Sequence, residues 1–453
     1  MAFIYNFFME GRRGNLPLSL WLLPLMLMAA ATASGQRHYV GGDISLLTKY
    51  EEKKANYLDQ DGKKIPDMLT FLKEQGLNTM RVRLFVDPSK ATDEEVGQGV
   101  CQDLPYVIAL GIRIKAAGLH FMLDFHYSDS WADPSNQWTP DDWKSLGNEQ
   151  LYTKIYDYTR DCLEQLNAAG ATPDFIQIGN EISYGMLWGP RNTRTYYCTQ
   201  QSSAATWTRF TTLLSQASKA CREVCPGAKV IIHSERTPKP DVMVDYYKRM
   251  DKAGVDYDVI GMSYYPYHHG DLNTFNNAMT KLENNFPNYE IMLVETGYYH
   301  KWQPADITFD YSSTYPITHE GQRQFTAALI SQIKQHQQVT GLVWWWLEAN
   351  EKGIDWRQPV TKDWYNAGLF DNETGRALPA LYELKSLTDG DQVALKGDVN
   401  GDSVVDVADI SAIISKMAGT AGSGSADAAD VNGDNTVDVA DISAVITIMA
   451  EGT

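Results

Sequence analysis

Two glutamates, Glu181 and Glu295, stand where apolar runs of strand length come to an end. Residues 175–178 lead through a glycine to Asn180-Glu181, and residues 290–294 lead directly to Glu295. A buried strand does not normally finish by placing a carboxylate in the open. In a parallel barrel, however, the carboxyl ends of the strands are where catalytic side chains collect. We therefore interpret both glutamates as candidate catalytic residues.

Two carboxylates on opposite sides of a barrel mouth suit the hydrolysis of a glycosidic bond. One protonates the leaving oxygen and the other attacks the anomeric carbon. A separation of about 5 Å means retention of configuration, because no water fits between the sugar and the nucleophile. The acid needs a pKa raised by burial and by its neighbour's charge, whereas hydrogen-bond donors must keep the nucleophile ionised.

Candidate donors to the nucleophile stand at two other predicted strand ends. Arg83 lies near the end of the alternating run 79–85, and Tyr264 and Tyr265 lie near the end of the run 258–266. A structural ion pair inside the barrel is the other interpretation of Arg83, and the two interpretations are compatible.

Strand-like and helix-like segments alternate through most of the chain and predict an α/β fold, a (β/α)8 barrel over residues 35–388. A doubly wound open sheet is the alternative, but it predicts a glycine-rich phosphate loop after an early strand, and none is present. The expected strands are 39–45, 79–85, 120–127, 175–182, 229–235, 258–266, 290–298 and 341–348. The expected helices include 100–118, 150–170, 206–224, 241–254, 272–285, 320–338 and 380–387.

The charge balance and the two ends of the chain narrow the functional class. A net charge of −18 argues against nucleic acid and anionic membranes as partners. Residues 1–34 are typical of an export signal, with Arg12 and Arg13 before an apolar run and a small-residue cleavage site near Ala33. We therefore expect a secreted or cell-surface protein.

The chain has five cysteines, so at least one thiol stays outside any pairing within the chain. No cysteine stands at zinc-site spacing with histidines.

An acidic tail follows a linker at residues 389–396. Residues 397–453 hold ten acidic side chains and one basic one, Lys416, and contain a duplication with a period of 32 residues. Each repeat places oxygen ligands at loop positions 1, 3, 5, 9 and 12, with a backbone carbonyl at position 7, which is EF-hand-like calcium coordination. The tail thus predicts a small all-α domain with two Ca²⁺ sites. The expected ligands are Asp398, Asn400, Asp402, Val404, Asp406 and Asp409 in the first loop, and Asp430, Asn432, Asp434, Thr436, Asp438 and Asp441 in the second.

Six segments in order, 78–83, 123–134, 177–181, 263–266, 294–298 and 377–379, resemble the family-53 glycoside hydrolases, the endo-β-1,4-galactanases. The resemblance implies that Glu181 is the acid/base and Glu295 the nucleophile, that galactan or arabinogalactan is the substrate, and that catalysis needs no cofactor. Two stretches depart from the family pattern, namely Trp344–Asn350 and the loop 300–319. The resemblance further implies substrate contacts by Arg83, His126, Asp129, Trp131, Asp133, Asn180, Tyr264, Tyr265 and Trp346.

The duplicated tail resembles dockerin modules, which dock catalytic subunits onto cohesin-bearing scaffold proteins. Both repeats carry Val-Ala after the ninth loop position, where many dockerins carry hydroxyl side chains. We expect a monomeric catalytic domain tethered to such a partner. Two alternatives stay open from the sequence: another retaining endo-glycanase such as a xylanase or mannanase, and a non-catalytic galactan-binding scaffold component.

Overall fold

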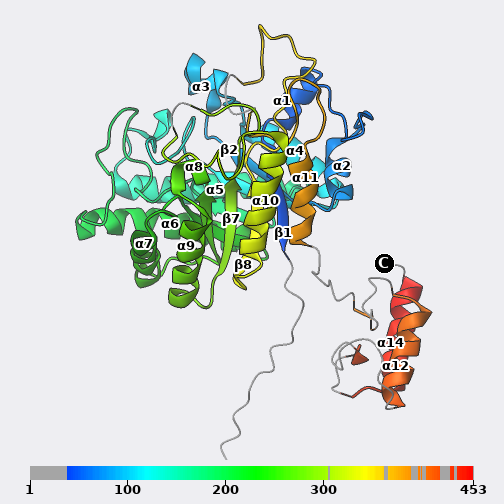
Figure 1. The fold of residues 1–453 in the computed structure, drawn as a ribbon. Coiled ribbons are helices and arrows are strands. Elements are labelled where there is room, and N and C mark those ends of the chain that lie inside the picture. The colour runs from blue at the N-terminus through cyan, green and yellow to red at the C-terminus, as the bar shows by residue number, and fades with distance from the viewer. Residues whose placement is uncertain are drawn as a thin grey trace, which may run out of the picture. The chain divides into compact units, whose positions relative to one another are not determined.

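Eight parallel strands close into one barrel in the computed structural model (Figure 1), which describes residues 38–304, 307–361, 366–388, 396–397, 399, 405–418, 429–432 and 436–451. Each strand pairs with the next along the chain, and β8 closes the ring against β1. This confirms the predicted barrel. The strands are β1 Tyr39–Asp43, β2 Thr79–Leu84, β3 His120–Phe125, β4 Phe175–Ile178, β5 Lys229–Ser234, β6 Val259–Tyr264, β7 Glu290–Thr296 and β8 Val339–Trp344.

Helices surround the barrel, and short polar side chains fix where many of them begin. Asp103, Ser203 and Asp271 each accept a hydrogen bond from the backbone N–H three residues later, as N-cap residues do. The long connecting helices are α4 Leu104–Ala116, α5 Asn148–Ala168, α6 Ala204–Val224, α7 Pro240–Ala253, α9 Leu272–Asn285 and α10 His319–Ile333. The shorter ones are α1 Leu47–Glu52, α2 Met68–Glu74, η1 Pro88–Lys90, α3 Asp93–Gly97, η2 Asp141–Trp143, α8 Pro266–His269, α11 Pro379–Glu383 and η3 Leu384–Leu387.

The barrel interior changes from apolar to polar along the strands. Met122, Phe175 and Ile231 belong to one buried apolar cluster inside the ring. Side chains two residues further along a strand point to the same face. Those residues are Asp124, Gln177 and His233, and all three are fully buried. The carboxyl end of the barrel therefore carries a layer of buried polar groups directly beneath its mouth.

The chain leaves β4 through a turn with two left-handed residues. Gly179 has φ 114° and Glu181 has φ 47°. A Cβ on Gly179 would lie 2.8 Å from Cγ2 of Ile182, so glycine satisfies both the torsion and the space. This turn presents Asn180 and Glu181 at the barrel mouth.

Strand β8 ends four residues before its predicted end. The sheet pairing stops at Trp344, and residues 345–348 form a turn in which Trp346 has φ 52°. The strict alternation of a strand is lost there, so the side chains of Trp345 and Trp346 do not point where a continued strand would send them.

The described residues beyond 394 form a second unit. It contains helices α12 Val407–Met417 and α14 Val439–Glu451, which confirms helices in this module. A small core joins Ile413 of the first helix to Val445 of the second, together with Val399, Ala412, Ala429 and Val431.

All five cysteines are free thiols. Within the described part of the chain, no helix is both long and apolar enough to cross a membrane.

Replacing Gly179 with alanine should destabilise the barrel by about 1–3 kcal/mol, because the side chain adds strain at a positive φ and a contact with Ile182. The measurement is equilibrium unfolding in denaturant. Gly170→Ala is the matched control: Gly170 has φ 76°, but a Cβ placed there would meet no atom within 4 Å, so the substitution should cost about 1 kcal/mol. Equal losses for the two variants would contradict the steric part of this account.

Candidate active site

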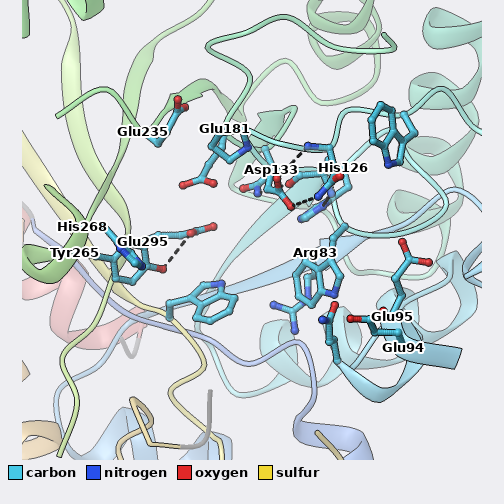
Figure 2. A pocket seen from close by; sticks show the side chains of 18 of the residues that line it. Arg83, Glu94, Glu95, His126, Asp133, Glu181, Glu235, Tyr265, His268 and Glu295 are labelled. Carbon is cyan, nitrogen blue, oxygen red and sulfur yellow. Dashed lines mark hydrogen bonds between the residues drawn. The ribbon is translucent and has the colours of Figure 1, made fainter. Parts of the chain in front are cut away.

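A cavity of about 730 Å³ opens at the carboxyl ends of the strands and contains both predicted glutamates (Figure 2). Glu295 is 6% exposed, and Glu181 lies in the turn after β4. Of the other residues singled out from the sequence, the cavity wall includes Arg83, His126, Trp131, Asp133, Asn180 and Tyr265.

Arg81, not Arg83, is the guanidinium that reaches the predicted nucleophile. Its Nη2 lies 3.0 Å from Glu295 Oε1, 2.8 Å from Asp124 Oδ2 and 2.9 Å from Asn180 Oδ1. Its Nη1 lies 3.0 Å from Asp43 Oδ2. Arg81 therefore ties together the ends of β1, β3, β4 and β7.

Arg83 is not the donor to Glu295, and its pairing agrees with the other interpretation from the sequence, a structural ion pair inside the barrel. It pairs with Asp43 at 3.3 Å, and its guanidinium lies 4.6 Å from the Trp131 ring centre and 5.2 Å from that of Trp346. The assignment fails because residues two apart on a strand share a face at heights that differ by roughly 6.6 Å. A side chain as long as arginine spans that difference, so the deeper Arg81 reaches the mouth.

Tyr265 donates its hydroxyl to Glu295 Oε2 at 3.1 Å. The neighbouring tyrosine, Tyr264, lies outside the cavity: it is fully buried, and its hydroxyl bonds the carbonyl of Gly270. Adjacent residues of a strand point to opposite faces. The choice between the two tyrosines left open by the sequence thus falls on Tyr265.

Glu181 is held by a chain of hydrogen bonds from β5 and β6. Ser263 donates to Glu181 Oε1 at 2.6 Å, and Ser263 Oγ lies 2.9 Å from His233 Nε2. The backbone N–H of Glu181 donates to His233 Nδ1, so the proton of a neutral imidazole belongs on Nε2. Burial holds the pKa of His233 well below its ordinary value, which keeps that ring neutral.

The two glutamates differ in the groups that face them. Burial raises the pKa of Glu295 to about 7, and Arg81 opposes that rise. Burial, followed by the charges of Glu295 and Glu235, raises the pKa of Glu181 well above its ordinary value. We expect Glu181 to keep its proton more strongly than Glu295, because the guanidinium lies at Glu295.

Asn180 and His126 are fixed by the backbone of the loop after β3. Asn180 Nδ2 donates to the carbonyl of Ala132 at 2.8 Å, and the N–H of Ala132 donates to His126 Nδ1 at 3.0 Å. The other ring nitrogen of His126 lies 3.0 Å from Asp124 Oδ2. Both side chains are thereby oriented before any ligand enters.

Besides Tyr264, two sequence-predicted contacts, Asp129 and Trp346, lie outside the cavity wall. Asp129 is buried beneath the loop and accepts the N–H of Asp141 at 2.7 Å, so it fastens the loop. Trp346 is fully buried against Arg83, and Trp345 takes its place in the wall because β8 ends at Trp344.

Several site residues were not predicted from the sequence. The polar layer under the mouth is formed by Arg81, Asp124, Gln177 and His233. The sequence feature that could have identified them is a polar side chain at an inward-facing position of an otherwise apolar strand. Glu235 carried the same signal as Glu181 and Glu295, because it is a carboxylate at the end of the predicted strand 229–235. Ser263 and Trp345 had no comparable signal, because each stands near a strand end whose geometry the sequence does not fix.

The last predicted ligands of the two calcium loops have similar surroundings, although one of the two donors differs by one loop position. Asp409 accepts the N–H groups of Val399 and Asp406, and Asp441 accepts those of Asn432 and Asp438. Both carboxylates are fully buried. Asp398, Asn400, Asp402, Val404 and Asp434 lie outside the described residues. No group of three or more metal-ligating side chains occurs among the residues that the structure does describe.

Helices α12 and α14 expose equivalent apolar residues. Val407 and Val439 are 66% and 63% exposed, and Ile414 and Ile446 are both 52% exposed. Each pair is separated by the 32-residue period of the duplication. Each helix therefore carries a copy of one apolar surface.

The chain matches two known families in separate segments. Residues 39–384 match glycosyl hydrolase family 53, and residues 396–449 match the dockerin type I domain. An uncharacterized protein of Niallia circulans is 32% identical over 77% of this chain and 93% of its own length. The arabinogalactan endo-β-1,4-galactanase of Cellvibrio japonicus (strain Ueda107) is 30% identical over 77% of this chain and 90% of its own. The GH53 catalytic domain of Ignisphaera aggregans superimposes with a TM-score of 0.67 at 32% identity, covering 79% of this chain and 98% of that structure.

The raised pKa of Glu295 predicts a pH-dependent stability. In the unfolded chain this carboxyl ionises near its ordinary value of 4.5, whereas in the folded protein it ionises near 7. Between these values the folded state binds more protons, so stability should fall as pH rises, by on the order of 1–3 kcal/mol. Unfolding free energies of the wild type and Glu295→Gln at pH 5 and pH 8 measure this, and the variant should lose less. An identical pH dependence in both proteins would contradict the assignment.

Proposed function

Because the chain belongs to glycosyl hydrolase family 53, we propose that it is an endo-β-1,4-galactanase that cleaves galactan or arabinogalactan with retention of configuration. One observation carries the proposal. Two glutamates face one cavity at the barrel mouth, with Arg81 and Tyr265 on Glu295 and only neutral donors on Glu181. That asymmetry suits one ionised and one protonated carboxyl, which the reaction needs.

In the first step, Glu181 donates its proton to the glycosidic oxygen while Glu295 attacks the anomeric carbon. The bond from that carbon to the leaving oxygen breaks, and an ester to Glu295 forms. Arg81 and Tyr265 contact Glu295 Oε1 and Oε2, so they can stabilise the negative charge that returns to this carboxylate when the ester is cleaved.

In the second step, Glu181 acts as the base. It takes a proton from a water molecule, the water oxygen attacks the anomeric carbon, and the ester bond to Glu295 breaks. The Ser263 hydroxyl can follow this change, since it donates to the carboxylate and can rotate when that oxygen carries the proton.

The remaining cavity residues suit contacts to sugar hydroxyls and ring faces. Asn180 lies beside the nucleophile, where we assign it to the hydroxyl next to the anomeric carbon. Asp133 and Arg83 present polar atoms, and Trp131 and Trp345 present apolar rings. His126 lines the wall with both ring nitrogens already bonded to Ala132 and Asp124. Asp129, Tyr264 and Trp346 are left out of this set because they do not line the cavity.

The substrate separates this proposal from its two alternatives. We expect the wild type to release reducing ends from β-1,4-galactan and not from xylan, mannan or cellulose. Cleavage of one of the latter alone would indicate another retaining endo-glycanase. Retention of galactan on an affinity gel without cleavage would indicate a non-catalytic binding protein.

Variants of the two glutamates should separate their roles. Glu181→Ala should lose about 10²–10⁴-fold in kcat on galactan, but far less on a dinitrophenyl galactoside whose leaving group needs no proton. Glu295→Gln should lose activity on both substrates, because no ester can form. The measurement is steady-state hydrolysis of both substrates. A similar loss for Glu181→Ala on both would contradict its role as acid.

The export signal and the tail complete the proposal. We assign residues 1–34 to a signal cleaved near Ala33, 35–388 to the catalytic domain, 389–396 to the linker and 397–453 to the dockerin module. The chain contains a dockerin type I domain, and the matching apolar surfaces of α12 and α14 support docking onto a cohesin-bearing scaffold. The secreted enzyme would then act outside the cell as a monomeric subunit of a larger assembly.

The twelve predicted ligands support two calcium ions in this module. Asp409 and Asp441 fit the last position of each loop, since each already accepts two backbone N–H groups of its own loop. Bound calcium would neutralise carboxylates that otherwise repel one another in a module with a small core.

Removal of calcium should unfold the tail and spare the barrel. With excess chelator, we expect limited proteolysis to cut within residues 397–453 while galactan hydrolysis stays within about twofold of the untreated rate, because metal binding and folding are linked. Re-addition of calcium should restore protection. A tail equally protected with and without chelator would count against the two calcium sites.

A further inference from the structure

A further carboxylate, Glu235, lies in the wall of the catalytic cavity; its charge helps to raise the pKa of Glu181, but the two steps above give it no contact with the sugar. It directly follows β5 and is 8% exposed. Figure 2 shows it on one side of Glu181, with His126 and Arg83 on the other. It therefore lies in the part of the cavity wall away from His126 and Arg83.

The hydrogen bonds of Glu235 are incomplete. Its Oε1 accepts from Ser183 Oγ at 2.5 Å and lies 3.2 Å from Arg236 Nε. Its Oε2 is buried and has no hydrogen-bond partner within the part of the chain that the structure describes. A buried acceptor without a donor costs about 1–3 kcal/mol. A ligand hydroxyl would supply the missing donor.

The orientation of the catalytic pair indicates which half of the cavity takes the leaving sugar. Asn180 and Glu295 are joined through Arg81 on β2. Glu181 is instead bonded to Ser263 on β6. The acid must stand over the glycosidic oxygen, so the sugar beyond it lies toward β5 and β6, where Glu235 stands.

We propose that Glu235 accepts a hydrogen bond from a hydroxyl of the sugar on the leaving side of the scissile bond, and so positions that sugar under Glu181. Ser183 and Arg236 hold the carboxylate in place. The inference rests on the proposed glycosidase function and adds a positioning residue for the leaving sugar and for any incoming sugar acceptor.

The same site would receive a sugar in the second step. If a sugar hydroxyl replaces water, its oxygen bonds to the anomeric carbon, its proton passes to Glu181, and the ester bond to Glu295 breaks. Glu235 should therefore influence the ratio between two reactions of the ester, namely attack by a sugar hydroxyl and attack by water. A residue that only supports the fold would change the amount of active enzyme but not this division.

The test compares Glu235→Ala and Glu235→Gln with the wild type and with Glu164→Ala, which removes a carboxylate exposed on α5. The substrates are linear β-1,4-galactan and a nitrophenyl β-1,4-galactobioside, whose leaving group carries no sugar. When galactobiose is added to the aryl reaction, it can accept the sugar from the ester in place of water. The ratio of this transfer product to the hydrolysis product is then measured.

We expect Glu235→Ala to lower kcat/KM on galactan about 10–100-fold, the loss of one hydrogen bond to a charged group. On the aryl substrate it should stay within about twofold of the wild type, and its transfer ratio should fall about 10-fold by the same argument. Glu235→Gln keeps an acceptor oxygen and should recover part of that ratio.

Equal losses of Glu235→Ala on the two substrates, or an unchanged transfer ratio, would overturn the inference. Failure of the wild type on galactan would instead overturn the proposed substrate. The same two readouts on whichever β-1,4-glycan it cleaves, with the matching aryl glycoside and acceptor, would still decide the role of Glu235.

Discussion

The buried guanidinium of Arg81 is the interaction on which the rest of the site depends. It lies 1% exposed between carboxylates from β1, β3 and β7, all within 3.0 Å. An unpaired charge in this position would cost several kcal/mol, so the ring of partners has to be assembled as the barrel closes. Through Asn180 and Glu295, the same guanidinium sets the electrostatic field of the cavity.

The difference between the two glutamates follows from that placement. Arg81 is bonded to Glu295 and draws it toward the ionised form, while Glu181 receives only a hydroxyl from Ser263 and has Glu235 as a further acidic neighbour. Two chemically identical side chains thus acquire different proton affinities from their surroundings. The strand order of the barrel produces these surroundings. Strands β2 and β3 lie on one side of β4, and strands β5 and β6 lie on its other side.

The positions and ends of the strands could be predicted from the sequence. The atoms that each long side chain contacts could not. The eight strands and the two glutamates followed from apolar runs that finish in polar residues. The contact of Glu295 with Arg81 instead of Arg83 depended on a difference in depth of two residues, which periodicity does not resolve because both side chains face inward. The exchange of Trp346 for Trp345 depended on a left-handed residue after β8, and no local signal marked it. Likewise, the choice of Tyr265 over Tyr264 required the position where β6 ends.

The central claim is that Glu295 forms the covalent bond to the sugar and Glu181 does not. A galactobioside with fluorine at the 2-position of the reacting sugar and a dinitrophenyl leaving group tests it most directly, because the slowed second step lets the ester accumulate. Peptide mass spectrometry of the protein after reaction should find one added 2-deoxy-2-fluorogalactobiosyl group, on Glu295. A label on Glu181 or Glu235, or complete turnover to a product of inverted configuration without any label, would contradict the account.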